Sequence, residues 1–591
     1  MIQLLSRLCA RSLAGRKLEF LALAGLMGAG ALAELLTLAM IIPFIAVLSN
    51  PTTATSYPLL QSLVSSIGWT DAEKIILPTS FLFALVTLSA GVIRFLLAWK
   101  SQRFVFNVGH DLSVAVYRRT LSQPYLYHTN INSSGVIAAT AKVDVVVYGV
   151  LLQLMQLITS VVLSASIIAA LMVINPIVTL AAAFGFGVVY VGIVALVRRR
   201  VQVNSTAWAN AQGERIKSIQ EGFGGIRDVL VDQTQESFVR RFAAADSALR
   251  QAQGANALIG AAPRYLVEAC GMVLIAVLAL ALSHEGGLNS ALPILAALAV
   301  GAQKLLPLLQ SIYNGWTNLA GHRQSLVDVL AVLDLPIEPD DVVRGAVTPI
   351  SFKRDIVLER VSFQYDATRP VVVRDLSIRI EKGSRVGFIG QSGSGKSTVV
   401  DLVMGLLPPT SGHVKIDGLA LTSDNIRSWQ TRIAHVPQAI YLADATITSN
   451  IAFGVAEKDV DFERLRDVVR QAELADFVET LPNRYGTVVG ERGIRLSGGQ
   501  RQRIGIARAL YKGASVLIFD EATNTLDNET EAAVMKAIRG LRRDLTILII
   551  SHRLSTMEVC DKIIRLKAGR IVGEGTYADM VSIERRANRL E

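Results

Sequence analysis

Six long apolar runs occupy the first 330 residues of the chain, and no other feature restricts its fold as strongly. A membrane-spanning helix needs about 20 mostly apolar residues, and each run reaches that length. The first run is also too long for the apolar core of a signal peptide, so we expect it to be retained. We therefore predict six spanning helices, at residues 20–48, 77–99, 146–174, 177–197, 255–282 and 291–312.

The composition agrees with a membrane protein that carries a soluble part. Hydrophobic residues make up 51% of the 591 residues and charged residues only 18%, whereas soluble domains are about a quarter charged. The net charge of +10 does not indicate nucleic-acid binding, because much of the basic charge flanks the apolar runs. The three cysteines lie far apart in the sequence, which excludes a disulfide framework or a cysteine-rich zinc site.

Basic residues gather on one side of the predicted spans. They precede the first span, follow the second and end the fourth: Arg7, Arg11, Arg16, Lys17, Lys100, Arg103, Arg118, Arg119, Arg198, Arg199 and Arg200. The opposite loops carry almost no basic residue, with Lys74 as the exception. Because cytoplasmic loops are enriched in lysine and arginine, we predict that the N-terminus is cytoplasmic.

The connections between the spans carry further predictions. The cytoplasmic connections at 100–145 and 198–254 are polar and compatible with helix, so the neighbouring spans should extend beyond the bilayer. Turn residues cluster at 124–135 and 222–225, which makes these segments candidate docking points for a soluble domain. The apolar stripe at 59–67 predicts either a helix in the outer interface or a loop helix packed on its own bundle.

The chain divides into three parts by pattern. We predict a transmembrane domain at 1–330, a linker at 331–350 and a soluble α/β domain at 351–591. Short apolar runs at 386–389, 516–519 and 546–550 are typical of buried parallel strands.

One of these strands leads directly into a phosphate-binding loop. The segment Gly390-Gln391-Ser392-Gly393-Ser394-Gly395-Lys396-Ser397 follows a predicted strand and precedes a helical segment at 398–407. This is a P-loop in its required context: backbone N–H groups surround phosphates, Lys396 reaches the β and γ oxygens, and the Ser397 hydroxyl ligates Mg²⁺. A glycine-rich turn without function does not account for this pattern.

Two acids supply the second half of a nucleotide site. Asp520 and Glu521 follow the strand at 516–519. Asp520 can hold Mg²⁺ through water, and Glu521 can orient the attacking water, because phosphoryl transfer depends mainly on positioning and charge stabilisation. A pair of acids after a strand is weak on its own but strong beside a P-loop.

The segment Leu496-Ser497-Gly498-Gly499-Gln500, followed by a basic helix, resembles the signature of ATP-binding cassette transporters. The resemblance covers essentially the whole chain and implies an exporter-type half-transporter: a six-span helical bundle followed by an α/β P-loop nucleotide-binding domain. It also implies that ATP and Mg²⁺ are the cofactors and that the chain is an ATP hydrolase coupled to transport.

The resemblance assigns a role to each matching residue. Tyr365 matches the aromatic residue that stacks on adenine, Gln438 the residue that contacts Mg²⁺ and the attacking water, and His552 the histidine that contacts the γ-phosphate. Asp527 matches the acid of a loop that here reads Asn-Thr-Leu-Asp in place of Ser-Ala-Leu-Asp. The catalytic set is Glu521, His552, Gln438 and Lys396, and the metal set is Ser397, Gln438 and Asp520. The ATP-binding set is Tyr365, Gly390, Gln391, Ser392, Gly393, Ser394, Gly395, Lys396, Ser397, Thr398, Gln438, Ser497, Gly498, Gly499, Gln500, Asp520 and Asp527.

A single cassette is incomplete in this family, because the signature of one domain closes the ATP held by the P-loop of another. Ser497 and the glycine N–H groups after it offer donors to a γ-phosphate. Two copies of one chain would give two equivalent sites, so we expect a homodimer, with a heterodimer of related chains as the alternative.

Charged residues within the spans are candidates for binding the cargo. Arg94, Arg264 and Lys304 lie on predicted spans, where charges are costly and are either functional or paired. The structural alternatives are that Arg94 reaches the membrane interface and that Arg264 pairs with Glu268 one helical turn away. Lys304 has no acid within one turn, so we expect it to face a water-filled cavity. In a homodimer these residues would place six positive charges around one chamber, which suits an anion.

The membrane part also resembles bacterial flippases of polyprenyl-pyrophosphate-linked oligosaccharides, in segment 34–48, Arg94, segment 263–268 and segment 304–307. This resemblance implies ATP-driven movement of an anionic lipid-linked saccharide from the inner to the outer leaflet of the bacterial inner membrane. The alternatives are an exporter of another amphiphile, such as a lipid, peptide or drug, and a soluble cassette ATPase without transport. Six spans argue against the last of these.

Overall fold

The computed structural model divides the chain into two compact units. The first comprises Met1–Gln123 and Asn130–Glu338, and the second comprises Pro124–Thr129 and Pro339–Glu591. The structure describes residues 1–12, 15–49, 76–130, 133–174, 176–286, 288–336, 350–366, 368–521 and 528–587. The stripe at 59–67, most of the predicted linker and Asp527 lie outside these ranges.

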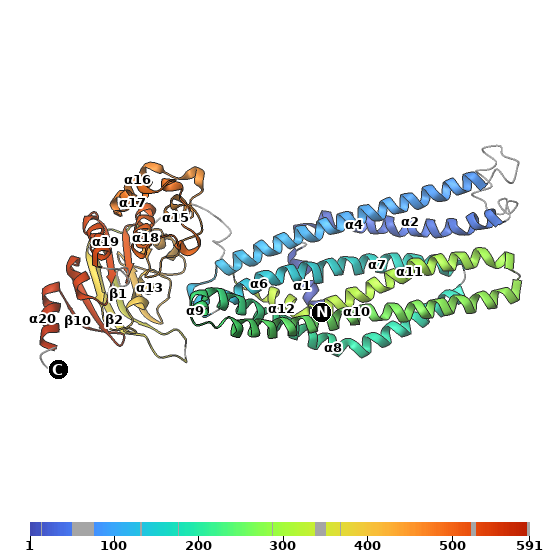
Figure 1. Cartoon of the computed structure of the whole chain (residues 1–591), viewed down its shortest axis with the longest axis horizontal. Helices are drawn as coiled ribbons and strands as arrows, with labels where there is room; N and C mark the ends of the chain where they lie inside the picture. Colours follow the sequence, from blue (N-terminus) through green and yellow to red (C-terminus); the bar gives the residue numbers. More distant parts are fainter. Residues whose placement is uncertain are drawn as a thin grey trace. The chain divides into compact units, whose positions relative to one another are not determined.

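Helices make up nearly all of the described part of the first unit (Figure 1). Six of them hold all or most of a predicted span: α2 (Lys17–Ser49), α4 (Ile76–Leu121), α7 (Leu152–Ile174), α8 (Pro176–Gly224), α10 (Gln235–Gly286) and α11 (Leu288–Gly321). The remaining helices are α1 (Ile2–Ser12), α6 (Ser133–Val146), α9 (Ile226–Val231) and α12 (Arg323–Leu333), and a π-helical turn at Val147–Leu151 joins α6 to α7. Among the described residues, three stretches are long and apolar enough to cross a membrane: Lys17–Leu48, Ile76–Leu121 and Ala139–Ile174.

The length of these helices carries them beyond a bilayer. At a rise of 1.5 Å per residue, α4, α8 and α10 are each about 70–80 Å long, whereas the hydrocarbon core is about 30 Å thick. The polar connections predicted at 100–145 and 198–254 thus fold largely as continuations of the spanning helices, with α8 packed along α10. Pattern and structure agree here because the apolar and polar stretches share one helical register.

Glycines let α11 approach α7 closely. A Cβ atom at Gly301 would lie 2.8 Å from the Leu171 Cδ2 atom, and one at Gly315 would lie 2.9 Å from the Leu157 Cβ atom. Both distances are shorter than carbon atoms tolerate, so a larger residue at either position would require the facing leucine to shift. Small residues at helix interfaces bring helix backbones together in membrane proteins. Helices α7 and α11 therefore pack closely against each other in the bundle.

Two sheets organise the second unit. Six strands form one sheet in the order β10-β9-β3-β8-β7-β6, and four form an antiparallel sheet in the order β2-β1-β4-β5. In the larger sheet β9, β3, β8, β7 and β6 run parallel, and β10 pairs antiparallel with β9. The strands are β1 (Asp355–Phe363), β2 (Val373–Glu381), β3 (Arg385–Ile389), β4 (Ser411–Ile416), β5 (Leu419–Ala420), β6 (Ile433–Val436), β7 (Val516–Asp520), β8 (Thr546–Ile550), β9 (Lys562–Lys567) and β10 (Arg570–Gly575).

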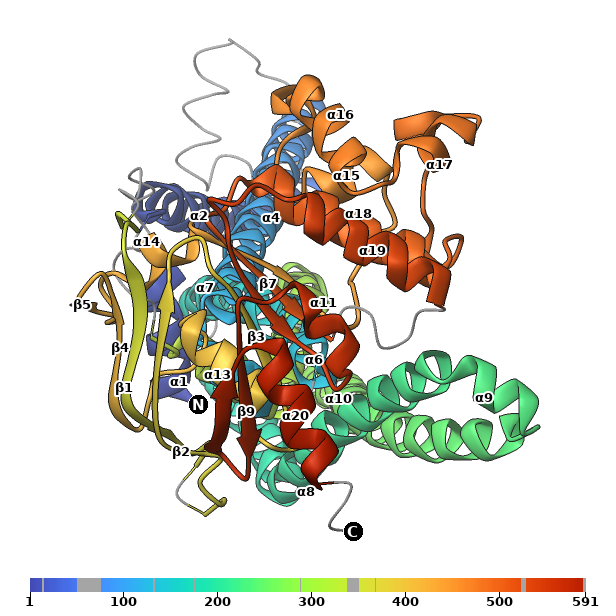
Figure 2. The same ribbon diagram turned by 90° about the vertical axis from the view of Figure 1, so that its left-hand side faces the viewer.

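The central strands are buried on both faces, which explains their continuous apolar runs. In β7, Val516 and Ile518 join one core cluster while Leu517 and Phe519 join the other. The cluster that contains Val516 and Ile518 also includes residues of α13 and of both sheets. Helix α13 therefore packs between the two sheets (Figure 2). Helices α16 and α18 contribute to the second cluster. The helices of this unit are α5 (Tyr125–Asn130), α13 (Lys396–Val403), α14 (Ile426–Gln430), α15 (Ile447–Ile451), α16 (Phe462–Gln471), α17 (Ala475–Thr480), α18 (Gly498–Lys512), α19 (Asn528–Gly540) and α20 (Tyr577–Ala587).

One predicted docking segment belongs to the second unit. Pro124–Thr129, which the sequence placed inside a continuous transmembrane domain at 1–330, groups with the α/β unit instead. Leu126 packs against the core cluster that lies between the two sheets. Burial also raises the pKa of Tyr125, with smaller contributions from Asp401 and Tyr365. The other predicted turn, at 222–225, joins α8 to α9 within the first unit.

Candidate functional site

Four neighbouring parallel strands bring the predicted catalytic residues to one edge of the larger sheet. The P-loop follows β3, His552 lies two residues beyond β8, Asp520 ends β7, and Gln438 lies two residues beyond β6. These strands are adjacent in the order β3-β8-β7-β6 and run in the same direction. Their carboxyl ends therefore meet at one edge, where α/β sheets bind ligands.

The P-loop has the backbone of a phosphate cradle. Gly393 and Gly395 adopt φ values of +75° and +99°, a region that side chains disfavour. A Cβ atom at Gly390 would lie 2.3 Å from the Leu566 carbonyl oxygen, so this position also requires glycine. The Ser394 hydroxyl is buried and has no hydrogen-bond partner within the described residues. The glycines let the backbone of this loop approach a ligand closely, and the Ser394 hydroxyl is left without a partner in the described part of the chain. Both features fit a loop that binds an anion.

Lys396 lies at the start of α13, directly after this loop. Its Nζ atom donates to the carbonyl oxygens of Gly390 (2.9 Å) and Gln391 (3.0 Å), so the ammonium group is held against the loop. Burial lowers the pKa of Lys396, while the charges of Glu521 and Asp520 oppose that shift. The side chain thus brings positive charge to the place where phosphate oxygens would lie.

Asp520 and Ser397 form a pair of oxygen donors. Burial raises the pKa of Asp520, the adjacent Glu521 raises it further, and a hydrogen bond with Ser397 lowers it. A carboxylate and a hydroxyl are ligands of the kind that Mg²⁺ prefers. The residues present therefore fit the predicted metal.

Glu521 and His552 are in direct contact across the edge of the sheet. The His552 Nε2 atom lies 2.5 Å from the Glu521 Oε1 atom. Glu521 adopts a φ of +48°, and its backbone N–H donates to the Ile550 carbonyl oxygen at 2.9 Å. A non-glycine residue at positive φ has a strained backbone, and such strained residues are common at functional sites. The contact holds the Glu521 carboxylate beside the P-loop.

Tyr365 and Gln438 lie at the margins of this site. The Tyr365 ring packs edge-on against Phe363, with ring centroids 4.9 Å apart, and its hydroxyl is 3.5 Å from the Thr398 hydroxyl. A cavity of about 880 Å³ is lined by 390–394 and His552 among the described residues, and Tyr365 does not line it. Gln438 is exposed to solvent.

The signature residues begin α18. Ser497 caps this helix: its hydroxyl accepts from the Gln500 N–H at 3.2 Å, and the Ser497 N–H donates to the Gln500 side chain at 2.9 Å. Within the described residues, no hydrogen bond joins Ser497 to the P-loop of the same chain. The signature glycines, Gly498 and Gly499, form the first turn of the helix, where backbone N–H groups are free to bind an anion.

The structure adds one acid to the nucleotide site that the sequence did not indicate. Asp401 lies in α13, and its pKa is raised to about 6, first by burial and second by the charge of Asp520. In the sequence Asp401 is an ordinary acid on a helix five residues after Lys396. Only the packing of the helix between two sheets buries it, so no local pattern could have identified it.

In the membrane unit, Glu34 holds two of the three predicted cargo-binding cations. Its side chain is 2% exposed, and it pairs with Arg94 (Nη1 to Oε1, 2.9 Å) and with Lys304 (Nζ to Oε2, 2.7 Å). Lys304 has no acid within one turn of its own helix, as predicted, but it pairs with an acid from another helix. The partner comes from α2, whereas a search within α11 alone finds no acid.

The third predicted cation is paired on its own helix. The Arg264 Nε atom lies 3.1 Å from the Glu268 Oε1 atom, as the structural alternative predicted. Three cations and two carboxylates then leave one net positive charge per chain in this region, and two in a pair of chains instead of the six expected.

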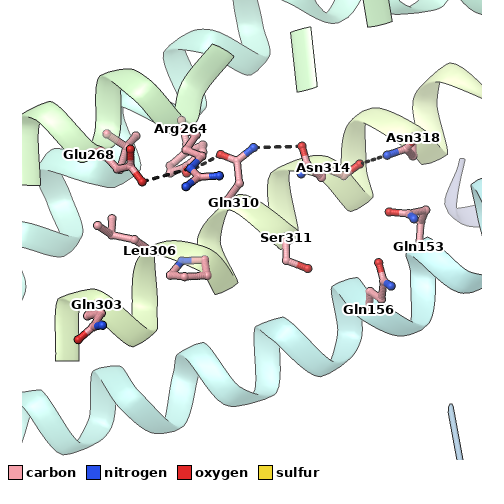
Figure 3. Close-up of a pocket in the computed structure, with 13 residues that line it drawn as sticks. Gln153, Gln156, Arg264, Glu268, Gln303, Leu306, Gln310, Ser311, Asn314 and Asn318 are labelled. Atoms are coloured by element: carbon pink, nitrogen blue, oxygen red, sulfur yellow. Dashed lines mark hydrogen bonds and ion pairs between the residues drawn. The ribbon is translucent and has the colours of Figure 1, made fainter. Parts of the chain in front are cut away.

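A polar cavity of about 680 Å³ lies between helices of the membrane unit. Arg264 and Glu268 line it, together with several glutamine and asparagine side chains of α7 and α11 (Figure 3). Arg94 and Lys304 are not among the described residues that line it. The sequence interpretation missed the amides, although their spacing along α11 was a signal that could have revealed them.

Two family models match the chain. The ABC transporter transmembrane region matches residues 20–300, and the ABC transporter model matches residues 373–524. A solved structure described as a bacterial Atm1-family ABC exporter with ATP bound has a TM-score of 0.75 over 94% of this chain and 96% of that chain, at 23% identity. This likeness concerns the fold, and it confirms the predicted fold class.

Several relatives are similar to this chain over a large part of its length. The ATP-dependent lipid A-core flippase of Bordetella avium is 34% identical over 389 residues, which are 65% of each chain. That of Alkalilimnicola ehrlichii is 32% identical over 400 residues, or 67% of each chain, and that of Methylococcus capsulatus is 42% identical over 254 residues, or 43% and 42%. The matches thus span about two thirds of the relatives' length or less. With both domain models in place and the P-loop, signature and acids assembled around one sheet, the chain belongs to the ABC transporter family.

Proposed function

We propose that the chain is one half of an exporter that couples ATP hydrolysis to the movement of a lipid across the bacterial inner membrane. The observation that carries the ATPase part is the contact between Glu521 and His552 beside the P-loop. It places a carboxylate, an imidazole and the Lys396 ammonium group at the carboxyl ends of adjacent parallel strands. No other arrangement in the described residues joins so many groups suited to phosphoryl transfer.

Each group has a distinct task in this proposal. The P-loop N–H groups and Lys396 bind and orient the phosphates, and Ser397 and Asp520 hold Mg²⁺, with Gln438 entering from the end of β6. Glu521 orients the attacking water, and His552 fixes the position of the Glu521 carboxylate. ATP supplies the phosphoanhydride bond when it is bound, and Tyr365 offers a ring for its base.

The proposal requires a second copy of the chain. The Ser497 hydroxyl is engaged in capping α18, and its helix N-terminus faces no P-loop group through a hydrogen bond in the described part of the chain. A second cassette can present its signature to this P-loop and complete the site. A homodimer gives two such sites by symmetry, and Asp527 is proposed to contribute to them.

The proposed cargo is an anionic, saccharide-bearing lipid that moves from the inner to the outer leaflet. Three relatives are named as flippases of lipid A-core, which supports a lipid cargo. The cluster of Glu34, Arg94 and Lys304 carries one net positive charge, and Arg94 is 43% exposed, so it can meet a phosphate group. The cassette and the N-terminus lie on the cytoplasmic side in this proposal.

Reconstitution tests the proposed function. Purified protein in liposomes should move a fluorescent polyprenyl-pyrophosphate oligosaccharide to the other leaflet only when ATP is present. Glu521→Gln should bind ATP and move no lipid. ATP hydrolysis by the parent without movement of this lipid or of a lipid A-type glycolipid would refute the cargo and leave the cassette assignment in place.

A further inference from the structure

Six of the thirteen described residues that line the cavity of the membrane unit carry amide side chains. Gln303, Gln310, Asn314 and Asn318 follow one another along α11 at intervals of seven, four and four residues. At about 100° per residue these positions lie within roughly 80° of arc, so they share one face of the helix. Gln153 and Gln156 of α7 line the same cavity (Figure 3).

One side of this cavity is fixed by hydrogen bonds. The Gln310 Nε2 atom donates to the Gly260 carbonyl oxygen (2.7 Å) and to the Asn314 Oδ1 atom (3.1 Å), and the Asn318 Nδ2 atom donates to the Asn314 carbonyl oxygen (2.9 Å). Side chains held in this way lose little freedom when they bind a ligand, because they are already ordered.

The other side of the cavity offers unused hydrogen-bonding groups. Gln153, Gln156 and Gln303 line the cavity and have no hydrogen-bond partner within the described residues. Each amide can donate two hydrogen bonds and accept others. A bundle that spans a membrane does not leave several such groups unpaired against lipid, because unsatisfied polar groups are costly there.

The charge of the cavity is balanced. Arg264 and Glu268 are the charged residues among those that line it, and they form an ion pair at 3.1 Å. A phosphate group accepts hydrogen bonds and would meet the Glu268 carboxylate unfavourably. A hydroxyl group donates and accepts, as amides and both members of the ion pair require.

We infer that this cavity binds the hydroxyl-rich saccharide part of the cargo, while the phosphate part lies elsewhere. The inference rests on the proposed function and names a separate site for one portion of its substrate. The volume of about 680 Å³ falls within the roughly 300–1,000 Å³ of small-molecule sites. A site built from hydrogen-bonding groups discriminates against a ligand that lacks their partners, because the ligand then displaces water from these groups without replacing its hydrogen bonds.

The test compares two lipids that differ only in the saccharide. Full-length protein in nanodiscs is titrated with fluorescent polyprenyl pyrophosphate, with and without an oligosaccharide. The parent should prefer the saccharide-bearing lipid. The double variant Gln156→Leu/Gln303→Leu should lose about tenfold or more of that preference and bind the bare lipid as before. The matched control is Gln202→Leu, an exposed glutamine of α8 outside the cavity, which should keep the full preference.

Each outcome decides the inference. An unchanged preference in the double variant, with Gln153→Leu also unchanged, overturns the saccharide site and leaves the proposed function standing. Equal binding of both lipids by the parent also overturns it. Displacement of the saccharide lipid by a short neutral peptide, lost in the double variant, assigns the cavity to peptide groups instead. A parent that binds neither lipid refutes the proposed cargo, and the inference falls with it.

Discussion

The nucleotide site and the membrane cavity are built from different kinds of sequence information. At the nucleotide site, the P-loop and the acids are short contiguous motifs, and the strand that precedes each motif delivers it to the same sheet edge. In the membrane unit, the decisive contacts join separate helices: Glu34 of α2 reaches Arg94 of α4 and Lys304 of α11. A site can therefore be predicted from the sequence when its residues form one contiguous motif. It cannot be predicted in this way when a residue's partner comes from another helix.

The largest effect that the comparison predicts is at the nucleotide site. Glu521→Gln removes the carboxylate that orients water, so the ATP hydrolysis rate should fall about 10²–10⁴-fold while ATP binding persists. Glu558→Gln is the matched control, because Glu558 is an exposed acid outside the P-loop. Its Oε2 atom lies 2.6 Å from the Arg539 Nη2 atom. A rate within threefold of the parent in Glu521→Gln would remove Glu521 from the catalytic role.

The next effect concerns the cluster that the sequence missed. Glu34→Gln leaves Arg94 and Lys304 without their shared carboxylate and should destabilise the protein by roughly 1–3 kcal/mol, a discounted range because Arg94 is partly exposed. The thermal midpoint of the detergent-solubilised protein measures this loss. Adding Lys304→Met should recover part of it, since one unpaired cation is then removed. If Lys304→Met recovers no stability in the Glu34→Gln background, Glu34 and Lys304 are not energetically coupled.

A smaller, pH-dependent effect belongs to Asp401. Its pKa rises from 3.8 to about 6 in the folded chain, so the folded state binds more protons than the unfolded state between these values. The unfolding free energy should therefore fall as the pH rises through this window. Asp401→Asn should flatten that slope and raise stability at pH 7 by roughly 1–2 kcal/mol, after allowance for partial exposure.

Thermal midpoints measured from pH 4.5 to pH 7.5 test the prediction for Asp401. Asp424→Asn is the control, because Asp424 is exposed on a loop of the same domain. Parallel curves for the parent and Asp401→Asn would show that burial of Asp401 does not contribute to the pH dependence.

The smallest effect on stability is expected at the signature. Ser497→Ala removes a helix cap and should cost about 1 kcal/mol. If a second cassette uses this serine, the ATPase rate should fall far more than the change in stability explains. Thr446→Ala removes the cap of α15 in the same way and should leave the ATPase rate close to that of the parent. Equal losses of activity in the two variants would reduce Ser497 to a structural role.

The sequence predicted much of the fold and less of the membrane site. Apolar length located the spanning helices, and buried strands located the P-loop and Glu521, because these features depend on neighbours in the chain. The sequence placed Pro124–Thr129 in the membrane domain, although the partly buried Leu126 packs against a core cluster of the α/β unit. It also did not identify the partner of Lys304 or the burial of Asp401, since both depend on tertiary contacts that no local pattern records.

The row of amide side chains on α11 (Gln303, Gln310, Asn314 and Asn318) could be predicted only in part from the sequence. Its spacing is visible in the sequence, but its meaning depends on α7, which supplies the facing glutamines, and on the ion pair of α10 that balances the charge. Helical spacing therefore identifies a polar face, and the packing of other helices decides whether that face is a binding site.

In the proposed mechanism, the cassette powers transport while the membrane unit selects the cargo. One competition experiment tests it most directly: proteoliposomes receive ATP and equal amounts of saccharide-bearing and bare polyprenyl pyrophosphate, each with its own fluorophore. We expect the parent to move the saccharide lipid faster, Glu521→Gln to move neither lipid, and Gln156→Leu/Gln303→Leu to move both at similar rates. Movement by Glu521→Gln, or an unchanged choice by the double variant, would contradict it.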